Sequence, residues 1–207
     1  MLETIVSAIA VYISTSIDYL IILMAVFAQA RAASSRRWIV GGHYAGTALL
    51  FVASLLAAFV AHRVPDEWAV GLLGLVPILL GIRAALAREE DGDVADEVAE
   101  RASGQSNLGL SWTMALVTIA SGGDNLGIYI PYFATLDAGK LTMVAVVFAV
   151  MIALLCYASL KLLDIPGVSE ILERYERVVL PVVFIGLGIF ILAEAGTISH
   201  LLGLVSS

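Results

Sequence analysis

The sequence has little cysteine and little charge, and each shortage excludes a class of protein. Cys156 is the only cysteine among 207 residues, so an internal disulfide and a Cys-x-x-Cys redox pair are both excluded. Charged residues make up 14% of the chain, which is too few for a water-soluble domain. The sequence also lacks a Gly-x-x-x-x-Gly-Lys-Ser/Thr motif, so nucleotide hydrolysis is not expected to drive its function.

Long apolar runs dominate the rest of the chain. Hydrophobic residues make up 60% of it, and the mean hydropathy is +0.97. Six runs of helical length cover about 4–30, 38–61, 67–87, 110–136, 140–163 and 178–204, and each can cross a hydrocarbon core of about 30 Å as a helix. The runs are continuous rather than alternating, which argues against barrel strands. We expect an all-α, polytopic protein of the cytoplasmic membrane with six transmembrane helices, in contact with the lipid bilayer, forming one domain over 1–207.

The positions of Lys and Arg predict the orientation, because cytoplasmic connections are enriched in them. Nine of these residues flank three connections: Arg31, Arg36, Arg37, Arg83, Arg88, Arg101, Lys161, Arg174 and Arg177. Only Arg63 and Lys140 fall on the other side, so both termini are expected outside. The first run has no Lys or Arg before it and is longer than the apolar part of a secretory signal, so we interpret it as a retained helix.

The first and fourth runs resemble each other. Residues 8–28 align without gaps with residues 114–134, which places Asp18 on Asp124 and Thr15 on Ser121. A shorter match, Leu-Gly-Ile, occurs around Gly81 in the third run and again in the sixth. Because the first and fourth runs cross the membrane in opposite directions, we expect two inverted three-helix repeats, over 1–88 and 108–207. This is a common plan of secondary transporters.

Each of the two matching runs carries one aspartate at mid-depth. A carboxylate there costs roughly 2.5 to 3.5 kcal/mol on insertion scales, so a function is expected to compensate for it. Helical spacing places Ser14 and Thr15 near Asp18, and Ser121 near Asp124. With the neighbouring Asn125 and backbone carbonyls freed by glycine and Pro131, these groups form an oxygen-rich site whose two negative charges match one divalent cation or two protons. The alternative role of each aspartate is to hold helices together by hydrogen bonds.

Two other side chains are candidates for metal binding. His43 lies in the second run and is either a proton shuttle or metal ligand, or an ordinary interfacial histidine. Cys156 is either a soft-metal ligand or a buried packing residue, and packing is favoured because no second sulfur is near in sequence. Tyr129, Tyr132 and Tyr157 could line a path, although tyrosines are common near membrane interfaces.

Two connections have distinctive compositions. The segment 89–107 contains seven acidic residues and one arginine. It is interpreted as a solvated, partly disordered connector, with an antechamber that attracts cations as the alternative. The later stretch Ser-Glu-Ile-Leu-Glu-Arg-Tyr-Glu-Arg-Val, over 169–178, predicts a short interfacial helix.

Four motifs together resemble the cadmium resistance transporter (CadD) family of the lysine exporter superfamily. They are Ser-Thr-Ser-Ile-Asp at 14–18, Gly-His-Tyr-Ala-Gly at 42–46, Leu-Val-Pro-Ile-Leu-Leu-Gly at 75–81, and Ser-Gly-Gly-Asp-Asn-Leu-Gly-Ile-Tyr-Ile-Pro at 121–131. The resemblance covers nearly the whole chain and implies a six-helix exporter that lowers intracellular cadmium, with Asp18, Asp124 and Asn125 at the ion site. Family members often have Gln where this chain has His43, so the ion preference can differ.

These observations predict a transporter rather than an enzyme. The expected activity is secondary-active efflux of divalent heavy metals, with cadmium or zinc as substrate, in exchange for protons and without a cofactor. Asp18, Asp124, Asn125, Ser14, Thr15, Ser121 and His43 are the expected metal-site residues. The alternative is an exporter of a cationic amino acid or another small organic cation, which would need a basic residue for the substrate carboxylate. An intramembrane hydrolase would need His or Glu beside the acids. No nucleic-acid partner is expected, and a homo-oligomer is compatible with the sequence.

Overall fold

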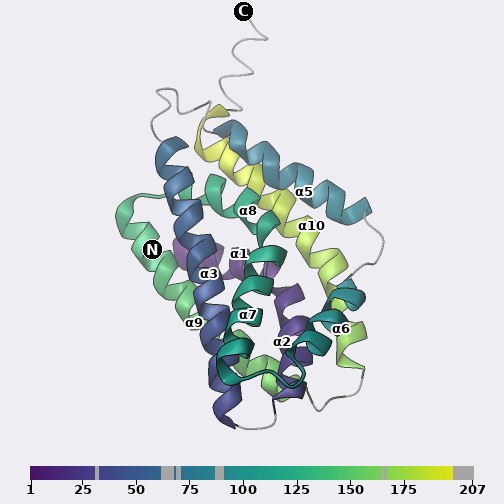
Figure 1. Cartoon of the computed structure of the whole chain (residues 1–207). Helices are drawn as coiled ribbons and strands as arrows, with labels where there is room; N and C mark the ends of the chain where they lie inside the picture. Colours follow the sequence, from purple (N-terminus) through teal and green to yellow (C-terminus); the bar gives the residue numbers. More distant parts are fainter. Residues whose placement is uncertain are drawn as a thin grey trace, which may run out of the picture.

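The computed structural model is a bundle of helices (Figure 1) and describes residues 1–30, 33–61, 68, 71–86, 91–163, 165 and 167–197. The helices are α1 Leu2–Ser14, α2 Ile17–Gln29, α3 Ala33–Ala61, the 3-10 turn η1 Leu72–Gly74, α5 Leu75–Leu86, α6 Asp91–Ala102, α7 Asn107–Ser121, α8 Gly123–Ala134, α9 Ala138–Leu162 and α10 Val168–Glu194. No strand occurs in these ranges, which confirms the all-α prediction.

The first and fourth apolar runs are both broken helices. The first is divided into α1 and α2, and the helix axis bends by 56° between them. The fourth is divided into α7 and α8 at Gly122, which ends one helix and begins the other. In the sequence alignment of the two runs, the break at Thr15 and Ser16 falls on Ser121 and Gly122. Both runs are therefore interrupted at matching positions, just before their aspartates.

The two broken helices run in opposite directions along the bundle. The starts of α3 and α7 are tied together by a hydrogen bond of 2.9 Å from Ser35 Oγ to Asn107 Oδ1. The chain therefore reaches this end through α2 and leaves it through α7, and Figure 1 shows both helices at the lower end. Of the cations used to predict the orientation, Arg31, Arg63 and Arg88 lie outside the described residues, so the sidedness stays a prediction.

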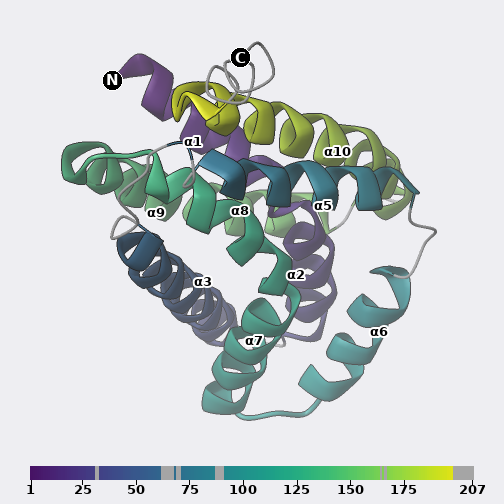
Figure 2. The ribbon, with the colours of Figure 1, turned by 90° about the horizontal axis from the view of Figure 1, so that it is seen from above.

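Glycines allow two pairs of helices to approach closely. On α3, Gly42 and Gly46 face α7: a Cβ atom at Gly46 would lie 2.6 Å from Cβ of Thr118, and one at Gly42 would overlap the carbonyl oxygen of Ser111. Gly42 and Gly46 therefore act as a Gly-xxx-Gly motif that lets α3 and α7 pack closely. The chain segments η1 and α5 pack along α10 (Figure 2), where a Cβ at Gly74 would lie 2.7 Å from the carbonyl oxygen of Gly188.

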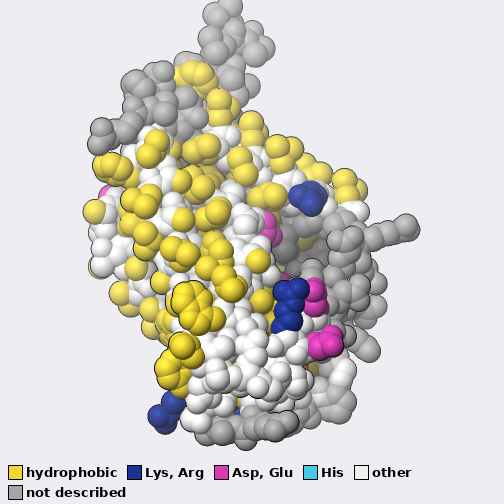
Figure 3. Space-filling view, in the orientation of Figure 1, with side chains coloured by type: hydrophobic (Ala, Val, Ile, Leu, Met, Phe, Trp, Pro, Cys, Tyr) yellow, Lys and Arg dark blue, Asp and Glu magenta, His cyan; other side chains and the backbone are white. Residues whose placement is uncertain are grey.

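The apolar surface is consistent with contact with lipid. Large exposed hydrophobic side chains cover the outer faces of several helices and include Leu49, Val52, Leu56 and Phe59 on α3, Leu79 and Ile82 on α5, Trp112 and Leu116 on α7, and Val146, Val150 and Leu154 on α9. Hydrophobic side chains are spread over the upper and left parts of the face shown in Figure 3, while most of the charged ones lie along its right side. Such extensive apolar exposure is typical of a surface covered by membrane.

Fewer helices qualify as membrane spans than the six runs predicted. In the described ranges, Ser34–Ala61 and Ala138–Leu162 are long and apolar enough to cross a bilayer, and the bent pair α1–α2 makes a third if it counts as one span. The fourth run is divided into pieces of 15 and 12 residues, and α5 has only 12. The six-span arrangement is therefore not confirmed, because breaks shorten the helices that would form it.

The acidic connection differs from the disordered connector that its composition predicts. Residues 91–102 form α6, which packs on α2. Ala95, Val98 and Ala102 are buried at helical spacing, and Arg101 forms an exposed ion pair with Glu97 at 2.6 Å. These three buried residues form the face through which α6 packs on the bundle. Residues 89 and 90 lie outside the described part of the chain.

One further expectation is corrected by a continuous helix. The stretch 169–178 is not a separate interfacial helix but belongs to α10, which continues through Pro181 to Glu194. Pro131 lies inside α8, where it has no N–H to donate to the carbonyl of Gly127, as the sequence predicts. Proline removes one backbone donor, and each helix nevertheless continues beyond its proline.

The docking of α6 leads to a stability prediction. Replacing Val98 by Asp puts a charge against α2 and should lower the free energy of unfolding by at least about 2 kcal/mol. Replacing the adjacent, exposed Glu97 by Gln should change it by at most about 0.5 kcal/mol, because only an exposed ion pair is lost. Thermal unfolding in detergent measures both variants. Equal melting temperatures would mean that α6 does not stay docked and would favour the original connector interpretation.

Candidate functional site

The two aspartates occupy the same local position in their helices. Asp18 is in the first turn of α2, and Asp124 is in the first turn of α8. The backbone N–H of Asn125 donates to Asp124 Oδ1 at 2.9 Å. The amino end of a helix carries a partial positive charge, which stabilises a carboxylate by about 0.3 to 1 kcal/mol. Both breaks therefore place a negative charge where the helix backbone favours it.

A buried hydrogen-bond network joins the two breaks. The amide Nδ2 of Asn125 donates to the backbone carbonyl of Thr15 and to Tyr19 Oη, both at 3.2 Å. Tyr19 Oη in turn donates to the carbonyl oxygen of Thr118 at 2.8 Å. All of these residues are buried. Four half-helices, α1, α2, α7 and α8, are thus held together within a few residues of the aspartates.

The hydroxyl groups predicted to surround the aspartates are largely engaged within α1. Ser14 Oγ donates to the Val11 carbonyl at 2.9 Å, and Thr15 Oγ1 donates to the same carbonyl at 2.9 Å. Because the Thr15 hydrogen is used in this way, the hydroxyl of Tyr129, 2.9 Å away, donates to Thr15 Oγ1. These contacts satisfy backbone carbonyls where α1 ends. Ser121, the counterpart of Thr15, is the half-buried last residue of α7.

Glycine is required at the second break because Tyr19 crosses it. A Cβ atom at Gly122 would lie 2.5 Å from Tyr19 Oη and would overlap the Leu50 side chain of α3. Gly123, by contrast, faces open space. The sequence prediction that glycine weakens the helix before Asp124 is confirmed, and the structure adds that Gly122 also makes room for the hydroxyl group.

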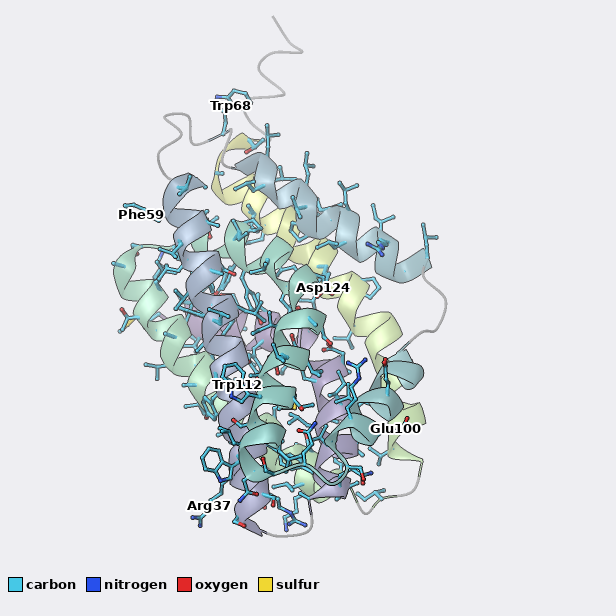
Figure 4. The ribbon with its side chains drawn as sticks, viewed as in Figure 1. Arg37, Phe59, Trp68, Glu100, Trp112 and Asp124 are labelled. Carbon is cyan, nitrogen blue, oxygen red and sulfur yellow. The ribbon has the colours of Figure 1, made fainter. Side chains whose placement is uncertain are left out.

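Both carboxylates lie at the edge of this network rather than inside it. Asp18 is half-buried and Asp124 is exposed, and each interacts electrostatically with the hydroxyl groups of Tyr19 and Tyr129. Figure 4 shows Asp124 at mid-height, between Arg37 at the lower end of the bundle and Phe59 and Trp68 toward the upper end. A carboxylate at that depth in a membrane protein is expected to face water or the bundle interior.

The other two candidate metal ligands, His43 and Cys156, are both buried. His43 is on α3, fully buried, with Nδ1 3.0 Å from Thr118 Oγ1 and its ring against Tyr19 at a centroid distance of 5.2 Å. Cys156 is buried in α9. Within the described ranges, no three His, Cys, Asp or Glu side chains come together. The acceptor atoms in the network that joins the two breaks are all oxygens, from the carbonyls of Thr15 and Thr118 and the hydroxyls of Thr15 and Tyr19.

Sequence reasoning missed Tyr19 and Thr118, which connect the broken helices. A signal for Tyr19 was present, since the alignment that pairs Asp18 with Asp124 also pairs Tyr19 with Asn125. These two residues contact each other, so the counterparts meet at the centre. Thr118 lies one turn before Ser121 and carried no signal of its own, because its role depends on α2 and α3 packing on both sides of it.

The chain was compared with known proteins. No curated protein and no solved structure gives a significant match. The model of the family described as cadmium resistance transporter matches residues 12–204, which include both helix breaks and both aspartates. This family consists of transporters, so the protein is not an enzyme, and its apolar helices agree with a membrane location. The chain belongs to the cadmium resistance transporter family.

Proposed function

We propose that the protein exports divalent heavy-metal ions, with cadmium as the first candidate, in exchange for protons at a site built on Asp18 and Asp124. The observation that carries the proposal is the pair of helices broken at matching positions, each with an aspartate in the first turn after the break. Transporters commonly bind ions where broken helices meet near the midplane. The family supplies the substrate class.

The charge of the site suits one divalent ion. Two carboxylates supply two negative charges, and the Thr15 carbonyl and the hydroxyls of Tyr19 and Tyr129 belong to the hydrogen-bond network that joins the two breaks. When the metal ion leaves, two protons take over its positive charge, because two carboxylate charges at membrane depth are costly. Metal ion and protons therefore compete for the same groups. That competition is the physical basis of an exchanger.

The contact between α5 and α10 supports the inverted repeat that alternating access requires. Sequence alignment pairs Gly81 with Gly188, and continuing it pairs Gly74 with Pro181. A Cβ at Gly74 would meet the carbonyl of Gly188, while one at Gly81 would lie 3.1 Å from the carbonyl of Pro181. If each residue is replaced by its counterpart in the other repeat, the contact of Gly74 with Gly188 becomes the contact of Pro181 with Gly81. A two-fold axis between the repeats produces such reciprocal contacts.

The experiment that tests this proposal measures metal movement in liposomes with a pH difference imposed in either direction. Metal is present at equal concentration on both sides, and protons flow toward the less acidic side. The metal should accumulate on the acidic side, whichever way the protein is inserted. With two protons per ion, a tenfold proton gradient supports an ion gradient of about 100-fold, because each tenfold ratio is about 1.4 kcal/mol.

The control is the same measurement with an ionophore that dissipates the pH difference, which should abolish accumulation. Metal movement that ignores the sign of the pH difference would rule out proton exchange. If lysine moves in place of the metal, the alternative of a cationic amino acid exporter would be favoured.

A further inference from the structure

Two polar atoms on α3 are buried without a hydrogen-bond partner within the described ranges. They are Nε2 of His43 and Oγ1 of Thr47. The two residues are 0% and 5% exposed. The residues are four positions apart, so they lie on one face of the helix. Leaving a buried polar group unsatisfied costs about 1 to 3 kcal/mol. Two such groups, one helical turn apart on the same face, point to a polar ligand at this face of α3.

Thr118 fixes the state of the imidazole. Its hydroxyl donates to the Met114 carbonyl at 2.8 Å, so its oxygen accepts a hydrogen bond from His43 Nδ1 at 3.0 Å. The proton is thereby assigned to Nδ1, and Nε2 presents a lone pair. Histidines that bind metals show this arrangement, with one ring nitrogen donating to a protein oxygen and the other facing the ion.

The location is next to the carboxylate site but separate from it. The His43 ring packs against Tyr19, which follows Asp18 in the chain and accepts a hydrogen bond from Asn125. His43 lies on the side of the break toward the starts of α3 and α7, since its partner Thr118 precedes the break at Gly122. His43 therefore lies between that end of the bundle and the second break, at which Asp124 follows.

We propose that His43 Nε2, together with Thr47 Oγ1, forms a second binding station for the transported ion and gives the transporter its preference for cadmium and zinc over harder ions. This rests on the proposed function. Carboxylate and carbonyl oxygens suit magnesium, calcium and manganese, whereas imidazole suits zinc and similar ions. The carboxylate site alone offers oxygen and would not reject hard ions. A nitrogen donor on the path supplies the discrimination.

The test measures binding of Cd²⁺, Zn²⁺ and Mn²⁺ to the purified full-length protein. His43→Gln should lower the affinity for Cd²⁺ and Zn²⁺ at least about tenfold and leave the affinity for Mn²⁺ within about twofold of its original value. Thr118→Val removes the acceptor for the His43 Nδ1–H and should lower the affinity for Cd²⁺ and Zn²⁺ by about 10- to 100-fold. Thr118→Ser keeps a hydroxyl acceptor and should restore both affinities. Thr47→Val preserves side-chain shape and should weaken the same two ions, so the proposal stays testable if His43→Gln does not fold.

Equal losses for all three ions, or no loss for any, would overturn the proposal and indicate a histidine that only packs or binds water. Asp124→Asn separates this inference from the proposed function. If that variant binds all three ions as the unaltered protein does, the carboxylate site is wrong whatever His43 does. If it binds none while His43→Gln leaves the ion preference unchanged, only the second station is wrong.

Discussion

Asp124→Asn should abolish metal export, with a loss of at least about 100-fold, or about 2.8 kcal/mol. Asn keeps the shape of the side chain but removes one of two charges that a divalent ion requires. The protein should still fold, because a charge at membrane depth is costly and its removal relieves that cost. Metal flux in liposomes checks the result, and Asp18→Asn should behave in the same way because it occupies the matching turn of α2.

Asp137→Asn is a matched control for this change. Asp137 caps the start of α9 in an exposed connection, and the Lys140 backbone N–H donates to its carboxylate at 2.9 Å. That hydrogen bond holds the pKa of Asp137 below its usual range. Its replacement should leave flux unchanged. Flux that survives in both Asp18→Asn and Asp124→Asn would contradict the carboxylate site.

The positions of the aspartates were predictable from sequence, but only one of the two helix breaks was. Gly122 and Gly123 mark the second break, because glycine weakens a helix wherever it occurs. The first break has neither glycine nor proline. It forms where the hydroxyls of Ser14 and Thr15 donate back to the carbonyl of Val11, and sequence pattern alone does not distinguish such a turn from a continuous helix.

Composition alone does not predict α6, because its buried face contains few large apolar residues among many acidic ones. Ala95, Val98 and Ala102 have helical spacing, but alanine is common in both helices and connectors, so the spacing carries a weak signal. Contacts between helices were unpredictable for a different reason. The bonds of Tyr19 to Asn125 and Thr118 join residues about a hundred positions apart, and only the packed bundle brings them together.

The contact between α3 and α7 determines how the His43 region and the second break are held together. Gly42 and Gly46 lie on either side of His43 along α3 and touch α7 at Ser111 and Thr118. Interhelical association in a membrane depends on close van der Waals packing, because lipid is as apolar as the side chains it replaces. A side chain added at this contact therefore separates α7 from α3 and disrupts the bond between His43 and Thr118.

Gly42→Leu should leave almost no folded protein, while Gly41→Leu should fold normally. A Cβ atom at Gly42 would overlap the backbone carbonyl of Ser111, which cannot move without shifting α7, whereas Gly41 is exposed and its Cβ would meet nothing within 4 Å. Overpacking typically costs about 1 to 3 kcal/mol, and more against backbone. Size-exclusion profiles and melting temperatures in detergent measure both variants, and Gly42→Ala should fall between them. Equal melting temperatures for the two leucine variants would mean that α3 and α7 are not in close contact.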